Sequence, residues 1–232
     1  MDSAKVWENI FQQKEWGKYP HLAVVKFIAK NFYRFEKNKR KNIKILEIGC
    51  GAGANLWFCA REGFSVYGID LSKTAIERLK KRFKEEGLLD RLLGAFVGDC
   101  YCKLDDLKDE SIDAILDVEC LCYNPFDKSK IILEKCFNKL KQGGVMLSIT
   151  FADGTWGLKG KEVDYHAVLP KEGPLANTGI CRYTTLDDIS RLYKLKNNVI
   201  TNVGKIDWYL DIENKEKVIK EWVIELKKVK RQ

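Results

Sequence analysis

One stretch decides the fold of this chain: Glu47-Ile48-Gly49-Cys50-Gly51-Ala52-Gly53. It completes a short apolar run at residues 43–48, which is typical of a buried parallel strand, and a helical pattern over residues 54–62 follows directly. Glycine permits a sharp turn and leaves room for a ligand to approach the backbone. The stretch therefore predicts a strand, a glycine-rich turn and a helix that together can hold a nucleoside.

The same alternation of strand and helix continues along the chain. Further strands are expected at residues 64–69, 92–97, 112–116, 145–151, 199–210 and 218–226. Further helices are expected at residues 22–32, 72–86, 131–140 and 186–195. Ser72 is a suitable N-cap for the second of these, the Gly143-Gly144 break ends the third, and Thr184 or Thr185 caps the fourth.

Strands that alternate with helices in this way predict right-handed crossovers and a parallel sheet. The last two strands flank a polar turn at residues 211–217 and are expected to pair as a hairpin. We therefore expect an α/β fold that is doubly wound, with a mostly parallel seven-stranded sheet, helices on both faces and a C-terminal antiparallel hairpin.

The length of 232 residues fits a single domain. We divide it into an N-terminal helical lid (1–42), a ligand-binding core (43–151), a substrate lid (152–183) and a C-terminal helix and hairpin (184–232). The two lids are expected because segments added near the carboxyl ends of the strands tend to cover the ligand crevice.

Composition points to a cytoplasmic protein without a membrane span. No apolar run approaches the length that crosses a bilayer, and the N-terminus lacks the pattern of a signal peptide. The eight cysteines are accordingly expected as reduced thiols. The net charge of +8 resides largely in basic runs at residues 37–44, 73–84 and 227–231, which we interpret as solvated surface, with a nucleic-acid partner as the alternative.

Carboxylates follow the second and third strands. Asp70 lies 21 residues after Gly49, the spacing at which a carboxylate in such folds accepts hydrogen bonds from ribose hydroxyls. Asp99 follows the third strand, where it can accept from the exocyclic amine of adenine. Because the carboxyl ends of parallel strands share one edge of the sheet, these groups are expected to converge on one ligand.

With these features the chain resembles the class I S-adenosylmethionine-dependent methyltransferases over residues 43–151. The resemblance implies S-adenosylmethionine as cofactor and S-adenosylhomocysteine as product. It places Glu47 near the methionine amino end, Asp70 at the ribose and Asp99 at the adenine, and it matches residues 112–119 and the Gly143-Gly144 turn. The cofactor-binding residues that we predict are Trp16, Tyr19, Glu47, Gly49, Cys50, Gly51, Gly53, Asn55, Asp70, Leu71, Ser72, Asp99, Cys100 and Asp117.

Other interpretations of the glycine stretch fit less well. A nicotinamide dehydrogenase has Gly-x-Gly-x-x-Gly, whereas Gly53 comes one residue early here and Glu47 precedes the first glycine. A radical enzyme needs a three-cysteine cluster of CxxxCxxC type, which the sequence lacks. Glycines that serve only a tight turn would not explain the spaced Asp70 and Asp99.

Methyl transfer from a sulfonium needs positioning, and a base only where the nucleophile carries a proton. Candidates near the carboxyl ends of the fourth and fifth strands or on the lids are Asp117, Glu119, Tyr123, Asp153, Tyr165 and His166. We predict His166, Tyr123 and Glu119 as catalytic, His166 first because its pKa lies near neutrality. No metal is expected: two Cys-x-Cys pairs, Cys100/Cys102 and Cys120/Cys122, leave zinc open, but structural zinc pairs are usually more widely spaced.

The sequence favours a small-molecule acceptor over nucleic acid. Asn124-Pro125-Phe126 only partly matches the motif of base and amide methyltransferases and is better interpreted as a turn into the next helix. Basic residues of the substrate lid suit a phosphorylated acceptor or one linked to a nucleotide or sugar; they are Lys159, Lys161, Lys171 and Arg182. By analogy this favours O-methylation in bacterial surface polysaccharide biosynthesis. An RNA methyltransferase and a catalytically silent cofactor-binding protein remain as alternatives, with a monomer or homodimer expected.

Overall fold

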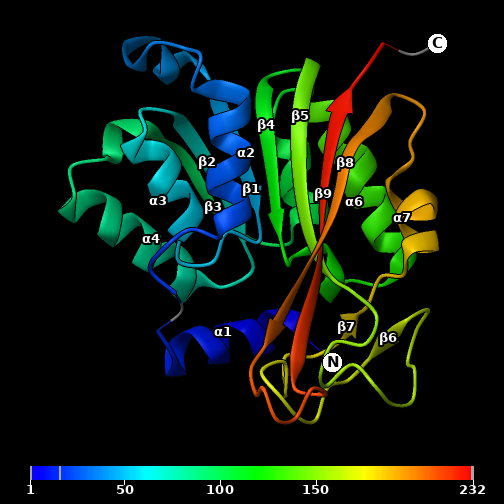
Figure 1. Ribbon diagram of the computed structural model, residues 1–232. Helices are drawn as coiled ribbons and strands as arrows, with labels where there is room; N and C mark the ends of the chain where they lie inside the picture. The colour runs from blue at the N-terminus through cyan, green and yellow to red at the C-terminus, as the bar shows by residue number, and fades with distance from the viewer. Residues whose placement is uncertain (1, 16, 231–232) are drawn as a thin grey trace.

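The computed structural model describes residues 2–15 and 17–230, with a seven-stranded sheet at their centre (Figure 1). In chain order the strands are β1 Lys44–Ile48, β2 Ser65–Asp70, β3 Leu92–Val97, β4 Ile112–Val118, β5 Leu140–Phe151, β8 Asn198–Tyr209 and β9 Val218–Lys228. Their spatial order is β3-β2-β1-β4-β5-β9-β8. Neighbours from β3 to β5 are parallel, and β9 is antiparallel to both β5 and β8. The predicted fold class is confirmed.

Helices cover both faces of the sheet (Figure 1). One face carries α2 Leu22–Phe32, α3 Ala54–Arg61 and α4 Lys73–Glu85, and the other carries α5 Cys100–Lys103, α6 Phe126–Lys139 and α7 Leu186–Tyr193. Side chains of a strand alternate between the faces, so Ile45 packs in the first core and Leu46 in the second. The remaining helix, α1 Ser3–Gln13, lies across the carboxyl ends of the strands.

Caps place the helices that border the site. The Ser72 hydroxyl accepts a hydrogen bond from the Ala75 amide at 3.0 Å, as predicted for α4. Thr185, the second of the two predicted caps, forms a capping box with Asp188 at the start of α7. The fixed φ of Pro125 suits the start of a helix, so α6 begins at Phe126, ahead of the expected residue 131.

The Gly143-Gly144 pair lies within β5, and the turn expected before this strand is an irregularity inside it. Leu140 pairs with Ile112 and Val145 pairs with Ala114, so the strand carries extra residues between the two pairings. Gly143 has a φ of +75°, which glycine adopts without strain. The strand therefore starts earlier than its apolar run.

Residues 152–183 contain a second, two-stranded sheet of β6 Ala167–Val168 and β7 Cys181–Arg182. Its Val168 and Cys181 bury a small third core together with Phe151 at the end of β5. Strands of two residues carry no periodic signal, which is why the sequence did not predict them. Four short 3₁₀ helices complete the described elements: η1 Lys37–Asn42, η2 Leu89–Arg91, η3 Leu104–Asp106 and η4 Leu121–Tyr123. Within residues 2–15 and 17–230, every helix is too short or too polar to cross a membrane.

Candidate functional site

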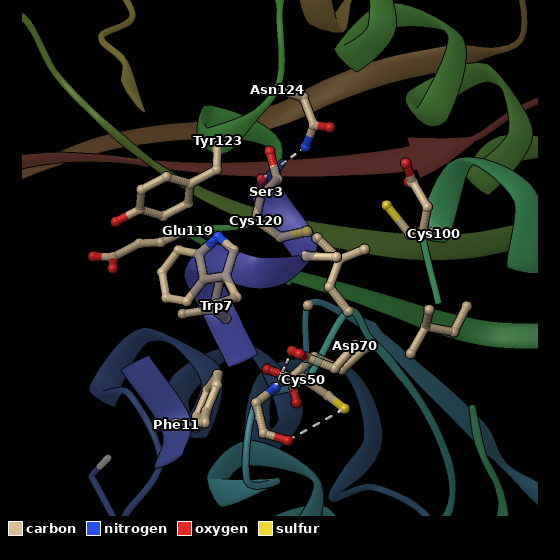
Figure 2. A pocket seen from close by; sticks show the side chains of 18 of the residues that line it. Ser3, Trp7, Phe11, Cys50, Asp70, Cys100, Glu119, Cys120, Tyr123 and Asn124 are labelled. Carbon is tan, nitrogen blue, oxygen red and sulfur yellow. Dashed lines mark hydrogen bonds between the residues drawn. The ribbon is translucent and has the colours of Figure 1, made fainter. Parts of the chain in front are cut away.

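A cavity of about 680 Å³ opens at the carboxyl ends of β1 to β4, beneath α1 (Figure 2). Its floor is the glycine turn after β1, and its walls are the residues that follow β2, β3 and β4. Figure 2 shows Trp7, Glu119 and Tyr123 grouped on one side, apart from Asp70 and Cys50. Strand ends that were expected to converge on one ligand therefore share one cavity.

The turn after β1 forms a cradle for a ligand, and its backbone conformation and close contacts require glycine. Gly49 and Gly51 have φ values of +63° and +51°, in the left-handed region. A Cβ atom on Gly49 would lie 2.6 Å from the Cβ of Cys120, and one on Gly51 would lie 3.1 Å from the Phe11 ring. The backbone of the turn is thus bare toward the cavity and can accept a ligand in close contact.

Glu47 supplies a buried oxygen without a partner. The Asn55 amide donates to Glu47 Oε1 at 2.6 Å, whereas Oε2 accepts no hydrogen bond from any described residue. Burial raises the pKa of Glu47 to about 8. A buried acceptor left unpaired is costly, so this oxygen fits a ligand that brings a donor. The ammonium group of S-adenosylmethionine is such a donor, which agrees with the role that the resemblance gave to Glu47.

Asp70 and Asp99 are held at the ends of β2 and β3. Asp70 accepts from the amides of Gly51 at 2.7 Å and Ser72 at 2.8 Å, and burial raises its pKa. Asp99 accepts from the Tyr101 amide at 2.9 Å and from Lys128 Nζ at 2.6 Å. Both carboxyl groups line the cavity with fixed orientations, and their roles at the ribose and the adenine stay predictions.

Asp117 lies behind the residues that line the cavity and does not contact the cavity itself. Its Oδ1 accepts from the amides of Cys120 and Leu121, both at 3.0 Å, and its Oδ2 accepts from the Ser148 hydroxyl. The carboxyl group is fully buried, and burial raises its pKa to about 6. Asp117 therefore shapes the loop after β4, and this loop carries Glu119, Cys120 and Tyr123 into the cavity wall.

Helix α1 closes the cavity from above. Ala4, Trp7 and Phe11 recur at helical spacing and face the cavity. The Trp7 ring packs edge-on against Tyr123 with centroids 4.8 Å apart. Glu8 fastens the helix to the start of α4, because its carboxylate accepts from the hydroxyls of Ser72 at 2.7 Å and Thr74 at 2.5 Å. These hydrogen bonds lower the pKa of Glu8 to about 2.

We expect Glu8→Gln to loosen α1 and to speed dissociation of S-adenosylmethionine about tenfold, since hydrogen bonds to a charged group contribute roughly 1.5–3 kcal/mol. Because the pKa of Glu8 is lowered, its contribution is present above the ordinary value near 4.5 and is lost as the pH falls toward 2. The fastening is thus intact at neutral pH. Stopped-flow Trp fluorescence measures the dissociation, and Lys5→Gln on the exposed face of α1 is the control; equal rates in both variants contradict the fastening.

Most predicted cofactor-binding residues line the cavity. They are Glu47, Gly49, Cys50, Gly51, Asn55, Asp70, Leu71, Asp99 and Cys100. Gly53, Ser72 and Asp117 lie behind the lining, where Gly53 allows close packing of the α3 turn against Leu79. Tyr19 is 77% exposed and packs edge-on against Trp57, away from the cavity. The prediction for Trp16 falls outside the described residues.

Of the three predicted catalytic residues, Glu119 and Tyr123 line the cavity and His166 does not. His166 Nδ1 lies 2.7 Å from an oxygen of Asp188, and the ring is stacked between Tyr165 and Tyr183 at centroid distances of 4.1 and 4.8 Å. Asp188 belongs to the capping box of α7. The geometry therefore gives His166 a structural setting against the start of α7, outside the cavity lining.

The cysteines do not gather around a metal. Cys100 faces Cys120 in the cavity wall, Cys122 faces Cys181 behind it, and Cys102 is exposed. The two Cys-x-Cys pairs thus meet only through Cys100 and Cys120, and among residues 2–15 and 17–230 there is no group of three or more side chains that could hold a metal. The contact with Cys100, together with burial, raises the pKa of Cys120 well above the ordinary value, and burial does the same for Cys122.

The structure also adds site residues that were not predicted from the sequence. The additional lining side chains include Trp7, Phe11, Cys120, Asn124 and Lys128. The spacing of Ala4, Trp7 and Phe11 was a usable signal for α1, since a helix with one apolar stripe must cover something. The others follow from how the β4 loop and α6 approach β3, which no local pattern encodes.

The strand order, the glycine cradle, the unpaired Glu47 oxygen and the strand-end carboxylates together define a class I S-adenosylmethionine-dependent methyltransferase domain. Residues 45–144 match the family described as methyltransferase domain. This part of the chain is therefore a methyltransferase domain, and S-adenosylmethionine is the cofactor of the class.

The chain is similar to methyltransferases that differ in their named substrates. The chain is 32% identical over 107 residues to a ubiquinone biosynthesis O-methyltransferase of Histophilus somni, covering 46% of this chain and 44% of that protein. It is 32% identical over 153 residues to the tRNA N(3)-methylcytidine methyltransferase trm140 of Schizosaccharomyces pombe, covering 62% and 48%. The chain thus spans less than half the length of both relatives. A solved SAM-dependent methyltransferase from Methanosarcina mazei superposes with a TM-score of 0.66 at 18% identity, covering 91% of this chain and 99% of that one.

Proposed function

We propose that this chain transfers the methyl group of S-adenosylmethionine to a small, uncharged acceptor that carries a hydroxyl group. The observation that carries the proposal is the cavity itself, in which one end has the cradle and carboxylates suited to the cofactor and the other has Trp7, Glu119 and Tyr123. Bound cofactor supplies an activated methyl group, so the chain's own residues need to position the acceptor and manage its proton.

The charge of the lining argues against a phosphorylated acceptor. Its acidic residues are Asp2, Glu47, Asp70, Asp99 and Glu119, and its only cation among the described residues is Lys128, which is paired with Asp99. The basic residues that favoured a phosphate in the sequence lie elsewhere: Arg182 is fully buried, and Lys159, Lys161 and Lys171 are exposed away from the cavity. A phosphate at this end of the cavity would therefore find no unpaired cation among the described lining residues.

The aromatic rings and the acids together fit a hydroxyl-bearing ring such as a sugar. The Trp7 and Tyr123 rings offer apolar faces, and Glu119 and Asn124 offer oxygen acceptors for hydroxyl groups. We still propose O-methylation of a sugar that later enters a polysaccharide. We no longer expect the cavity to recognise a phosphate group on that sugar. The acidic lining weighs in the same way against an RNA backbone in this cavity.

Calorimetric titration tests the cofactor half of the proposal. We expect S-adenosylmethionine and S-adenosylhomocysteine to bind, NAD not to bind, and Asp70→Asn to weaken binding at least about tenfold, since hydrogen bonds to a charged group contribute roughly 1.5–3 kcal/mol. Asp90→Asn on the exposed η2 is the matched control. If neither sulfur nucleoside binds, the proposed function is wrong.

Transfer of labelled methyl tests the acceptor half. The protein is incubated with methyl-labelled cofactor and separately with uncharged sugars, sugar phosphates and tRNA. Label in an uncharged sugar is the expected result. Label confined to sugar phosphates would overturn the charge argument, and label in tRNA would make the chain an RNA methyltransferase.

A further inference from the structure

Beside the proposed acceptor position, a carboxyl group of the cavity wall meets a second carboxyl group that is buried behind the lining. Glu119 lines the cavity directly after β4, and its φ of +57° turns its side chain out of the direction of the strand. Glu221 comes from β9, opposite Phe151 at the carboxyl end of β5, and is 3% exposed. The carboxyl groups lie within hydrogen-bond distance of each other. This contact joins two residues that are far apart in the chain.

Carboxyl groups in contact share one proton, because two adjacent negative charges in a buried place repel strongly. The donors around the pair decide where the proton resides. Trp208 Nε1 donates to Glu221 Oε2 at 2.8 Å, and His21 Nε2 lies 3.5 Å from the same oxygen. His21 Nδ1 accepts from the Ala23 amide at 3.1 Å, so Nε2 carries the hydrogen and donates toward Glu221.

These donors stabilise Glu221 as the ionised partner and lower its pKa. Burial and the neighbouring Glu221 raise the pKa of Glu119 well above its ordinary value, so Glu119 holds the proton. The other titratable groups that face the pair are acidic or neutral. They are Asp117 of β4, Tyr123 of η4, Cys181 of β7 and His21 ahead of α2. None of these groups brings a positive charge to the pair.

We propose that Glu119 and Glu221 act as a carboxyl pair that holds one proton between them. The pair releases this proton when the positively charged sulfonium of the cofactor binds, and it takes up a proton from the acceptor during methyl transfer. This inference rests on the proposed function and makes Glu221 a participant that the sequence did not reveal. It also specifies the acceptor further, because the pair is useful only if the nucleophilic atom carries a proton.

The step balances in atoms and charge. Arrival of the positive sulfonium releases the shared proton to solvent and leaves both carboxylates ionised. A lone pair of the acceptor oxygen then forms the bond to the methyl carbon, and the electron pair of the broken carbon–sulfur bond stays on sulfur. The acceptor's O–H proton passes to Glu119 as the positive charge disappears, which restores the one-proton pair. The net products are methyl ether, S-adenosylhomocysteine and one proton.

Comparison of the two sulfur nucleosides isolates this effect. S-adenosylmethionine and S-adenosylhomocysteine share the adenosine and amino-acid parts, so proton changes at Glu47 cancel between them. Calorimetry in two buffers of different ionisation enthalpy counts the protons released with each ligand. We expect wild-type protein to release more protons with S-adenosylmethionine near neutral pH, and the ratio of the two affinities to rise with pH, by at most tenfold per pH unit for one proton.

Variants locate the proton. Glu119→Gln is expected to remove the difference between the ligands, and Glu221→Gln to move it to lower pH because Glu119 loses its negative neighbour. Glu225→Gln, on the same strand but paired with Lys30, should leave the difference unchanged. Equal proton release with both ligands in wild-type protein overturns the carboxyl pair and leaves the proposed function standing, whereas failure of both ligands to bind overturns the proposed function itself.

Discussion

Glu47→Gln is expected to lower the affinity for S-adenosylmethionine about 100-fold, because loss of one partner of a buried ion pair costs roughly 3 kcal/mol or more. Glutamine keeps the shape of the side chain and can still bond Asn55, but it offers no negative charge to an ammonium group. The variant therefore removes the interaction for which the unpaired Oε2 is available.

The pH dependence of cofactor affinity provides a second, independent test of this prediction. The raised pKa of Glu47, about 8, means that the free protein carries this group protonated at pH 7. Cofactor binding must release that proton, so wild-type affinity should rise from pH 7 to pH 8, and the rise should be smaller in the variant.

As the pH rises, the free energy of unfolding of the wild-type protein should fall, whereas its affinity for the cofactor should rise. A group with a raised pKa contributes stability that is fully present below its ordinary value of 4.5 and is lost as the pH rises through about 8. The variant lacks this loss, so its free energy of unfolding should exceed that of the wild type at pH 8.

5′-Methylthioadenosine is the control ligand, because it lacks the amino-acid part of the cofactor. Its affinity should be equal in wild type and Glu47→Gln, and should fall in Asp70→Asn. If the variant binds S-adenosylmethionine within threefold of wild type, Glu47 does not hold the ammonium group.

The parts of the site that could be predicted are those that one strand end determines by itself. The glycine turn, Asp70 and Asp99 each follow their strand directly, and parallel strands bring their carboxyl ends to one edge whatever the other details of packing. Fold and cofactor position follow from the same local pattern. The N-cap at Ser72 was equally local and is confirmed.

The parts that could not be predicted depend on packing between distant segments. Glu221 meets Glu119 only because β9 inserts between β5 and β8 with one particular register, which places Glu221 opposite Phe151. A shift by one residue would turn it to the other face of the sheet. His166 illustrates the converse: its residue type favoured catalysis, but two tyrosine rings and Asp188 hold it away from the cavity.

Arg182 departs from its expected place for a related reason. It belongs to the two-residue strand β7, where it is fully buried, and its guanidinium lies 5.7 Å from the centre of the Phe126 ring. The sequence placed it with exposed lysines because β7 carries no recognisable pattern. The substrate side of the site thus cannot be inferred from charge counts along the chain.

Gly49→Ala is expected to destabilise the protein by about 2–4 kcal/mol and to abolish measurable cofactor binding, since a left-handed φ and overpacking both penalise the new methyl group. The φ of +63° alone costs alanine roughly 1 kcal/mol. The added Cβ would also lie 2.6 Å from Cys120 Cβ and 2.7 Å from its sulfur, so the loop after β4 must move.

Two further variants separate these causes in urea unfolding and calorimetry. Gly87→Ala has nearly the same φ, +66°, with no atom within 4 Å of the new Cβ, so it should cost only roughly 1 kcal/mol and leave cofactor binding unchanged. Cys120→Gly removes both side-chain atoms that the new methyl group at position 49 would strike, and combined with Gly49→Ala it should recover part of the lost stability. Equal destabilisation by Gly49→Ala and Gly87→Ala would show that backbone strain, and not the contact with Cys120, requires glycine at position 49.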